Sequence, residues 1–322
     1  MGGGVWYDWW MEQVLETLTF GVFEFELEAV DRIVFPEFKG NVFRGAMGNA
    51  LHKLTCALKG GECGQCLVRD RCVYARIFES HNTNGESILK NIEKAPHPFI
   101  IYIPDHQRFE YQAGESFVFH LTLVGNAIEF LSYFILAFEY IGANGIGPER
   151  GTFKVKRVTV GESDVYDPAA KKVNQNFRVM KGCDFTSTDN DANHSPLQIT
   201  FVTPLRLRFN GKFQKHITFE MLIRSLLRRL YVLSSHYCGG PNHVDFSHLA
   251  NQAATIKISH SRISWRQQMR FSHRQKRSIS MGGITGQLQF TGHITPFIPY
   301  LQLAQHLHIG NGTGLGLGKI KL

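Results

Sequence analysis

The sequence predicts an α+β protein made of two similar domains in tandem, each with the element order β-α-β-β-α-β. Three observations support this fold class: a length of 322 residues with 43% apolar and 19% charged side chains, an internal repeat, and apolar patterns that alternate between strand and helix spacing. The length suits roughly two domains of about 150 residues. The composition excludes fibrous, collagen-like and disordered proteins.

The internal repeat joins residues 117–155 to residues 284–322, which align without gaps at a constant offset of 167 and share eleven of 39 positions. Phe130/Phe297 and Leu136/Leu303 are among the identities, so the match extends beyond glycines. Each copy reads strand, helix, glycine loop, strand. A duplication therefore predicts that the copies close two similar domains.

In the first half, Phe23, Phe25 and Leu27 alternate with glutamates, which predicts a half-buried strand. A helix is expected over about 42–58, and the repeat copy begins with a strand at 117–123 before a helix. The core face of the 42–58 helix is predicted from residues at helical spacing: Phe43, Met47, Ala50, Leu51, Leu54 and Leu58.

In the second half, apolar residues alternate with arginines over 205–209 as in a strand, and Thr218 is placed to cap a following helix. A polar stretch with a proline, residues 184–196, suits a surface connection. The boundary is placed there. The N-terminal domain is expected to span residues 1–190 and the C-terminal domain residues 197–322.

Positive charge is concentrated at the end of the chain. The net charge is +8 and the pI is about 9.2, which favours a polyanionic partner. After Asp245 there is no Asp or Glu, whereas these last 77 residues carry nine Lys and Arg. The partner is therefore expected to bind the C-terminal half.

A cationic segment with interleaved aromatic residues lies within this tail. Guanidinium groups clamp phosphates and aromatic rings stack on single-stranded bases, so the segment favours RNA over a merely solvated charged face. Charge alone does not exclude DNA. The predicted RNA-binding residues here are Arg262, Trp265, Arg266, Arg270, His273, Arg274, Lys276 and Arg277.

A glycine stands at every second position near the C-terminus: Gly310, Gly312, Gly314, Gly316 and Gly318, followed by Lys319. Such a loop can present backbone N–H groups to phosphates, with the lysine supplying charge. A flexible glycine turn is the alternative. A dinucleotide-binding fold is disfavoured because this run follows a helix, whereas that fingerprint opens one.

Four cysteines, Cys56, Cys63, Cys66 and Cys72, have the spacing C-x6-C-x2-C-x5-C. Four thiolates suit a structural zinc ion, and an iron–sulfur cluster uses the same ligands. Unligated buried thiols are the third interpretation. Their clustering within 17 residues fits a metal site better than a disulfide framework.

His52 projects away from the apolar stripe of the predicted 42–58 helix. Gly45, Gly48 and Thr55 share its side, so a large ligand could lie there and bring a phosphodiester to the imidazole. A solvated surface histidine is the alternative. No stretch of about 18 apolar residues spans a membrane, and the N-terminus lacks a signal-peptide pattern, so a cytoplasmic protein is expected.

Taken in order, these motifs resemble the CRISPR precursor-RNA-processing endoribonucleases of the RAMP superfamily over most of the chain. The resemblance rests on residues 38–51 (FKGNVFRGAMGNAL) with the cysteine cluster and Val73-Tyr74-Ala75, and on C-terminal motifs. These are Thr203-Pro204-Leu205, Trp265, Ser272-His273-Arg274-Gln275, Gly282-Gly283-Ile284-Thr285-Gly286 and the closing glycine run.

The resemblance implies two ferredoxin-like domains of RNA-recognition type, with a cysteine-rich metal-binding insertion in the first. It further implies that CRISPR repeat RNA is cleaved without a catalytic metal. The ribose 2′-OH attacks its own 3′ phosphate and leaves a 2′,3′-cyclic phosphate. His52 would be the catalytic acid or base, and Arg44 and Lys53 would contact RNA and stabilise charge.

Two other functions fit the same residues. The chain could be a non-catalytic RNA-binding subunit of a CRISPR effector complex, with other effector subunits as partners. It could also be a zinc-containing DNA-binding module. An RNA-cleavage assay distinguishes the non-catalytic subunit from the enzyme. Competition by duplex DNA would identify the DNA-binding module.

Overall fold

A computed structural model of the chain describes residues 6–58, 63–79, 95–104, 108–186, 196–272 and 277–322. The chain divides into two compact units. The N-terminal unit comprises residues 20–179, and the C-terminal unit comprises residues 180–322 together with residues 1–19. Most of the stretch predicted to connect the domains, residues 187–195, lies outside the described residues.

The N-terminal unit is built on an antiparallel sheet with the strand order β3-β5-β1-β6-β7-β8. Its strands are β1 (Thr19–Ala29), β2 (Ile33–Val34), β3 (Phe99–Tyr102), β4 (Glu110–Tyr111), β5 (Ser116–Val124), β6 (Phe153–Val160), β7 (Ser163–Asp167) and β8 (Lys172–Val173). Its helices are α2 (Lys39–Thr55), α3 (Val73–Phe78) and α4 (Leu131–Asn144). The short strands β2 and β4 form a separate pair.

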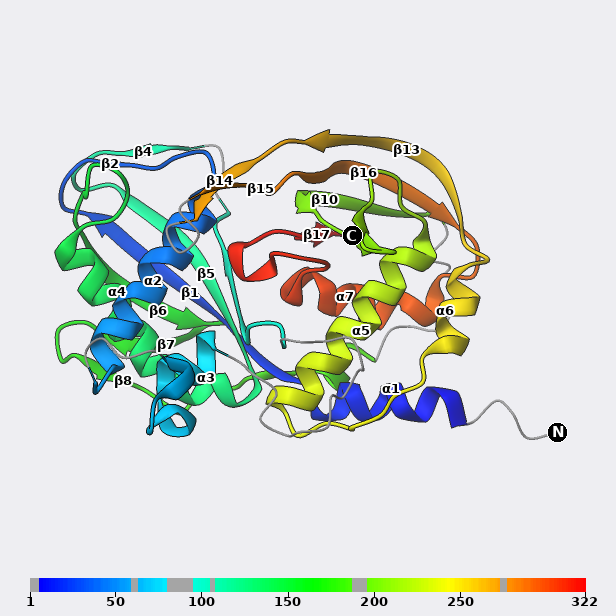
Figure 1. Cartoon of the computed structure of the whole chain (residues 1–322), viewed down its shortest axis with the longest axis horizontal. Helices are drawn as coiled ribbons and strands as arrows, with labels where there is room; N and C mark the ends of the chain where they lie inside the picture. Colours follow the sequence, from blue (N-terminus) through cyan, green and yellow to red (C-terminus); the bar gives the residue numbers. More distant parts are fainter. Residues whose placement is uncertain (1–5, 59–62, 80–94, 105–107, 187–195, 273–276) are drawn as a thin grey trace. The chain divides into compact units, whose positions relative to one another are not determined.

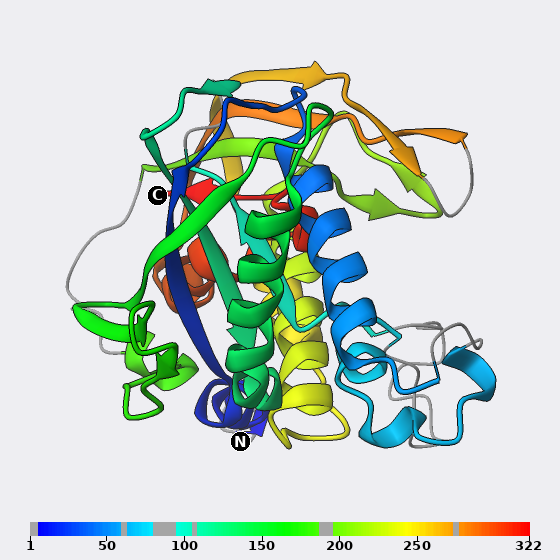
Figure 2. The same ribbon diagram turned by 90° about the vertical axis from the view of Figure 1, so that its left-hand side faces the viewer.

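Helices α2 and α4 lie side by side against this sheet (Figure 2). The core between them is aromatic: the ring of Phe119 lies 4.7 Å from Phe25 and 4.4 Å from Phe138, and Phe43 of α2 completes the cluster. All four side chains are almost completely buried. Burying large apolar side chains is the dominant favourable contribution to folding, so this cluster fixes α2 on the sheet.

The helix predicted over about 42–58 runs from Lys39 to Thr55 instead. Phe43, Met47, Ala50 and Leu51 are buried as expected. Leu54 and Leu58, however, are 37% and 54% exposed, so their assignment to the core was wrong. The apolar spacing in the sequence continues through Leu54 and Leu58, but the sheet no longer covers the helix there. The end of the buried face is therefore set by tertiary packing and not by the sequence pattern.

The C-terminal unit has the sheet order β13-β16-β10-β17. Its strands are β9 (Met180–Lys181), β10 (Leu197–Leu205), β11 (Arg208–Phe209), β12 (Lys212–Phe213), β13 (Lys257–Arg266), β14 (Met269–Ser272), β15 (Arg277–Ser280), β16 (Gly283–Thr291) and β17 (Ile320–Lys321). Its helices are α1 (Trp6–Thr17), α5 (Phe219–Tyr237), α6 (Ser247–Ala253) and α7 (Ile298–Leu307). Figure 1 labels these elements.

Each unit contains the ferredoxin-like arrangement. In chain order the four main strands are β1, β3, β5 and β6 in one unit and β10, β13, β16 and β17 in the other, and both sets pair in the spatial order second, third, first, fourth. One helix follows the first strand and another follows the third. The predicted tandem α+β fold is confirmed.

The internal repeat matches equivalent elements. At the offset of 167, β5 (Ser116–Val124) falls on β16 (Gly283–Thr291), and the start of α4 at Leu131 falls on the start of α7 at Ile298. The Thr218 cap is also confirmed, because its Oγ1 accepts a hydrogen bond from the Met221 backbone N–H at 3.2 Å. The strand predicted over 205–209 is instead divided: β10 ends at Leu205 and β11 begins at Arg208.

Within the residues that the structure describes, none of the helices is long and apolar enough to span a membrane.

Candidate nucleic-acid interface

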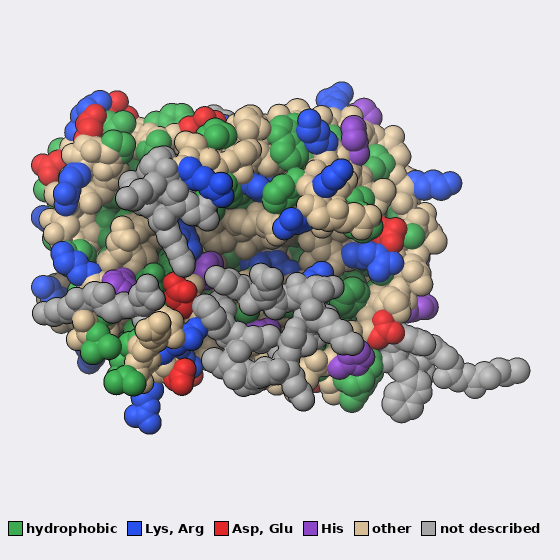
Figure 3. Space-filling model, in the orientation of Figure 1, with side chains coloured by type: hydrophobic (Ala, Val, Ile, Leu, Met, Phe, Trp, Pro, Cys, Tyr) green, Lys and Arg blue, Asp and Glu red, His purple; other side chains and the backbone are tan. Residues whose placement is uncertain are grey.

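Strand β13 lies at the edge of the C-terminal sheet and exposes most of its residues. Its pairing with β16 places Arg262 opposite Gln287 and Arg266 opposite Gly283. Both arginines are exposed, and strand alternation puts them on the same face. Figure 3 shows Lys and Arg side chains over β13 and β16 with few acidic residues beside them.

Trp265 of β13 is half-buried, on the opposite face of the strand from Arg266. Its indole Nε1–H donates to Gln267 Oε1 at 3.2 Å, and the Lys215 ammonium lies 5.9 Å from the ring centroid. The tryptophan therefore belongs to the cationic surface that the sequence predicted, although part of its ring packs against protein.

After β13 the cationic segment forms a hairpin of β14 and β15. Arg270 stands opposite Ile279 in this hairpin and is half-buried, whereas Arg277 is exposed. Among the described residues, neither Arg262 nor Arg270 forms an ion pair. Three predicted RNA-binding residues, His273, Arg274 and Lys276, lie outside the described residues.

Arg206 is a cation of this region that the sequence analysis missed. It follows β10, is 7% exposed, and donates from Nη1 to the Ser280 carbonyl oxygen and the Met281 sulfur, each at 3.0 Å. Burial lowers its pKa, and the positive charge of Arg270 lowers it further. In the sequence Arg206 resembled any polar residue of an alternating strand, so only the packing distinguishes it.

A second missed feature is the β11–β12 hairpin, which carries Phe209 and Phe213 with 46% and 42% of their surface exposed. Its turn is Asn210-Gly211, with φ of 48° and 78°. Asn-Gly is the dipeptide most typical of such two-residue turns, so the sequence did contain a signal for the hairpin. The Arg206 guanidinium lies 4.3 Å from the Phe213 ring centroid.

The glycine loop mainly makes contacts inside the protein. Gly310, Gly312, Gly316 and Gly318 have φ between 74° and 85°, a conformation that other residues rarely adopt. An added Cβ at Gly318 would lie 1.9 Å from the Ile309 carbonyl oxygen. Six residues of the loop donate their backbone N–H groups to acceptors within the protein: Asn311, Leu315, Gly316, Leu317, Gly318 and Lys319.

These internal bonds give the glycines a structural role. A phosphate-binding role for Gly310, Gly312, Gly314, Gly316 and Gly318 stays a prediction. The Lys319 ammonium is also engaged, because it donates to the Gln305 carbonyl oxygen, and burial lowers its pKa. Nearby His308 is buried, which lowers its pKa well below the usual value.

In the N-terminal unit, His52 is half-buried near the end of α2. Its ring meets the Tyr74 ring edge-on, with 4.8 Å between centroids. The open helix face predicted beside it is covered, because an added Cβ at Gly48 would lie 3.1 Å from the Phe78 ring. Tyr74 and Phe78, both from α3, stack at 5.2 Å and lie along this face. The prediction of open space for a large ligand beside Gly48 was therefore wrong.

The other predicted residues of α2 each contact an aromatic ring. The Arg44 guanidinium lies 5.2 Å from the Phe78 ring centroid, and its Nη2 is 3.2 Å from His97 Nε2. The Lys53 ammonium lies 5.3 Å from the Tyr140 ring. Arg44 thus brings a second imidazole, that of His97, toward the helix that carries His52. The predicted roles of His52, Arg44 and Lys53 stay predictions.

All four clustered cysteines line a single small cavity in the N-terminal unit, of about 20 Å³, which is roughly the space of one water molecule. His52 and Tyr74 line it too. Burial raises the pKa of Cys63, with Glu79 and the other three cysteines adding to the effect. The spacing thus did predict cysteines that meet in space.

A metal-holding arrangement is not shown, however. In the described part of the chain, no group of three or more His, Cys, Asp or Glu side chains has the geometry to hold a metal ion. The metal-binding insertion and its zinc ion therefore stay predictions.

Chemically, the C-terminal unit offers exposed arginines and aromatic rings on a sheet edge and a neighbouring hairpin, an arrangement suited to phosphates and unstacked bases. The N-terminal unit offers imidazole and guanidinium groups suited to proton transfer and charge stabilisation. Two ferredoxin-like units in one chain define the class of this protein by its fold.

Family comparisons agree with this class. Residues 199–320 match the family described as CRISPR-associated endoribonuclease Cas6, and residues 18–177 match a family described as an N-terminal domain. The resemblance to the CRISPR-associated endoribonucleases is thereby confirmed over residues 199–320.

Among similar proteins, an uncharacterized protein of Archaeoglobus fulgidus is 22% identical over 263 residues, covering 80% of this chain and 81% of its own. A Cas6 product complex has a TM-score of 0.55 at 12% identity, with 94% of this chain and 98% of that one covered. A partial Cas6-RT-Cas1–Cas2 complex has a TM-score of 0.58 at 15% identity over 94% of this chain. The chain spans 46% of that protein, about half its length.

Proposed function

We propose that this protein is an endoribonuclease that cleaves CRISPR repeat RNA to produce guide RNAs. The observation that carries the proposal is the Cas6 match over residues 199–320, which include most of the stretch without Asp or Glu that follows Asp245. Exposed Arg262 supplies charge for the RNA backbone, and exposed Phe209 and Phe213 offer rings for base stacking.

The proposed reaction needs no metal. The 2′-OH of the nucleotide before the cut attacks the adjacent phosphorus, the bond to the 5′-oxygen breaks, and the products end in a 2′,3′-cyclic phosphate and a 5′-OH. Such a step requires a base for the 2′-OH, an acid for the leaving oxygen and a cation near the phosphorane. His52 is our candidate for proton transfer, and Arg44 is our candidate cation.

Cleavage of a repeat RNA in the presence of a chelator tests this function. Purified protein is expected to cut a repeat RNA in EDTA, and a single 2′-deoxyribose at the cut site should abolish product because the nucleophile is missing. Deoxyribose one nucleotide away is the matched control and should leave cleavage intact. Cleavage that persists with the deoxyribose at the cut site would rule out the proposed attack.

A second candidate function is a non-catalytic RNA-binding subunit. The packing of His52 against Tyr74, beside the cysteine-lined cavity, favours it, because that environment also suits a purely structural histidine. Repeat RNA that binds in the same assay but is never cut would identify this function. If duplex DNA competed equally with the RNA, neither RNA function would hold.

A further inference from the structure

Two guanidinium groups of the C-terminal unit have no acidic partner among the residues that the structure describes. In the same described part, Arg206 and Arg270 each have a buried Nε without a hydrogen-bond acceptor. Neither forms an ion pair with a described residue, and the chain has no Asp or Glu after Asp245.

The two arginines come from different elements that meet at the β14–β15 hairpin. Met269 pairs with Ser280, and Arg270 pairs with Ile279. The Ser280 carbonyl oxygen is the group to which Arg206 donates. The charge of Arg270 acts on Arg206, and burial lowers the pKa of both side chains. The hairpin therefore brings Arg206 next to the strand that carries Arg270.

The glycine loop fixes the main chain of Arg206. The Arg206 carbonyl oxygen accepts a hydrogen bond from the Asn311 N–H at 2.9 Å. An added Cβ at Gly310 would lie 2.5 Å from that oxygen, so only glycine permits the approach. On the side-chain end, the guanidinium rests over the Phe213 ring. The loop thereby positions an arginine rather than contacting a ligand itself at this point.

This arrangement is unfavourable in the protein alone. Partly buried charges normally gain a partner, because desolvation and like-charge repulsion both oppose the ionised form. An oxyanion that accepts hydrogen bonds from the terminal nitrogens of both guanidinium groups would neutralise the repulsion. A phosphodiester has the required charge and acceptor geometry.

We infer that Arg206 and Arg270 bind one backbone phosphate of the RNA, and that the exposed side of Phe213 stacks on the adjacent base. This subsite rests on the proposed function for its ligand. The aromatic ring distinguishes a nucleotide from free phosphate as the occupant, because inorganic phosphate has no group to stack on it.

A linkage scan on the unaltered protein tests the subsite. Repeat RNAs that each carry one neutral methylphosphonate are compared by fluorescence anisotropy, and one linkage is expected to reduce affinity about tenfold because its charge-assisted hydrogen bonds are lost. The Arg206→Met and Arg270→Met variants should bind unmodified RNA about tenfold more weakly and be insensitive to that linkage.

Arg224→Met is the matched control, since Arg224 belongs to the same unit and is paired with Glu220. It should retain the linkage effect. Arg206→Met is also expected to keep or raise the melting temperature, since it removes a buried charge that lacks an acidic partner.

Two results would overturn the subsite. The first is that both variants remain sensitive to the modified linkage. The second is that inorganic phosphate stabilises the unaltered protein but not Arg206→Met, while the unaltered protein and Arg206→Met bind RNA equally well. The second result would assign the arginines to a free anion. Failure of the proposed function looks different, because the linkage effect would then remain in an RNA that is never cleaved.

Discussion

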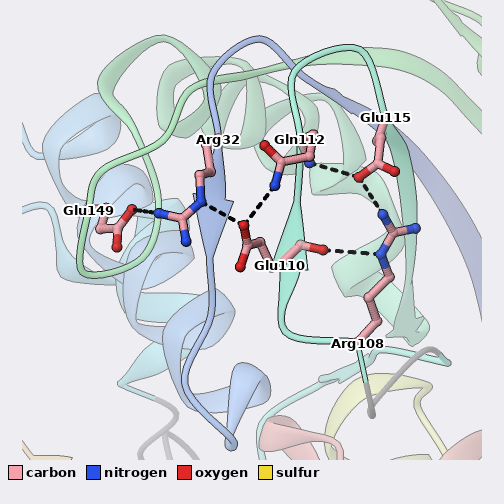
Figure 4. Close-up of polar contacts among 6 residues, drawn as sticks. All are labelled: Arg32, Arg108, Glu110, Gln112, Glu115 and Glu149. Atoms are coloured by element: carbon pink, nitrogen blue, oxygen red, sulfur yellow. Dashed lines mark hydrogen bonds and ion pairs between the residues drawn. The ribbon is translucent and has the colours of Figure 1, made fainter.

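Arginines occupy two different environments in this chain. In the N-terminal unit, beside strands β2 and β4, Arg32 donates to Glu110 at 2.6 Å and to Glu149 at 2.8 Å. Arg108 contacts Glu115, and Gln112 donates to both carboxylates (Figure 4). In the C-terminal unit, Arg206, Arg262 and Arg270 form no ion pair with any residue that the structure describes.

The two groups of arginines differ in whether a carboxylate lies within ion-pair distance. Exposed ion pairs contribute little to stability, but they neutralise the arginine and leave it little affinity for another anion. An arginine without an acidic partner keeps its charge for a ligand. Within the proposed function, the comparison therefore favours these arginines of the C-terminal unit, rather than Arg32 or Arg108, as phosphate-binding residues.

The largest expected effect separates the roles of the two units. His52→Ala is predicted to lower the single-turnover cleavage rate by about 10²- to 10⁴-fold, the usual cost of losing a general acid or base. RNA affinity should stay unchanged. His120→Ala, which removes an imidazole hydrogen-bonded to Glu24, is the control and should cleave normally. A His52→Ala variant that cuts at the original rate would exclude His52 from catalysis.

The cysteine cavity provides the next test, on stability. The protein is predicted to hold one zinc ion per chain by elemental analysis, and chelation or Cys63→Ser should lower its melting temperature because structural zinc contributes directly to folding. Cys183→Ser lies outside the cavity and should change neither quantity. Metal-free protein with the same melting temperature as freshly purified protein would show that the thiols are unligated.

Substituting one arginine at a time tests whether arginines without an acidic partner bind RNA more strongly than arginines in ion pairs. Arg262→Gln is predicted to weaken RNA binding about fivefold and to reduce the slope of log affinity against log salt by about 0.7, the value for one phosphate contact on a single strand. Arg32→Gln should leave both unchanged, because its charge is already paired. Equal effects of the two substitutions would show that pairing does not decide which arginines bind RNA.

The smallest expected effect concerns acid pH. The Glu110 side chain accepts a hydrogen bond from Arg32, which lowers its pKa below 4.5. The Gln112 N–H and Arg108 similarly lower the pKa of Glu115. When a carboxylate has a lower pKa in the folded state than in the unfolded state, its ionised form stabilises the fold above the unfolded pKa. This stabilisation is lost as the pH falls through the folded-state pKa.

The Glu110→Gln/Glu115→Gln variant should therefore lose less stability than the unaltered protein between pH 5 and pH 3 in thermal melts, because it has no such contribution to lose. The effect is small because both carboxylates are exposed. Identical acid sensitivity of the two proteins would show that these pairs contribute nothing measurable.

Much of the fold was predictable because it depends on patterns among residues that are close together in the sequence. The alternation around Phe25 and the capping position of Thr218 depend on a few neighbouring residues, and the repeat at offset 167 reveals the duplicated arrangement. Leu54 and Leu58 were misassigned because periodicity does not say where a helix leaves its sheet.

The candidate site was predictable only in part. Arg262 and Trp265 could be identified because the cationic segment is continuous in sequence. Arg206 could not, since its significance comes from Arg270 and Phe213, which approach it only in the folded unit.

By itself, the sequence determined which residues carry charge, where acids are absent, and how strands, helices and glycine turns follow one another. The tertiary structure alone decided that Phe78 covers Gly48, that His52 lies against Tyr74, and that Arg206 contacts the hairpin that carries Arg270. The physical reason is that burial and electrostatic interaction depend on distance in space, and contacts between residues far apart in the chain leave no local pattern.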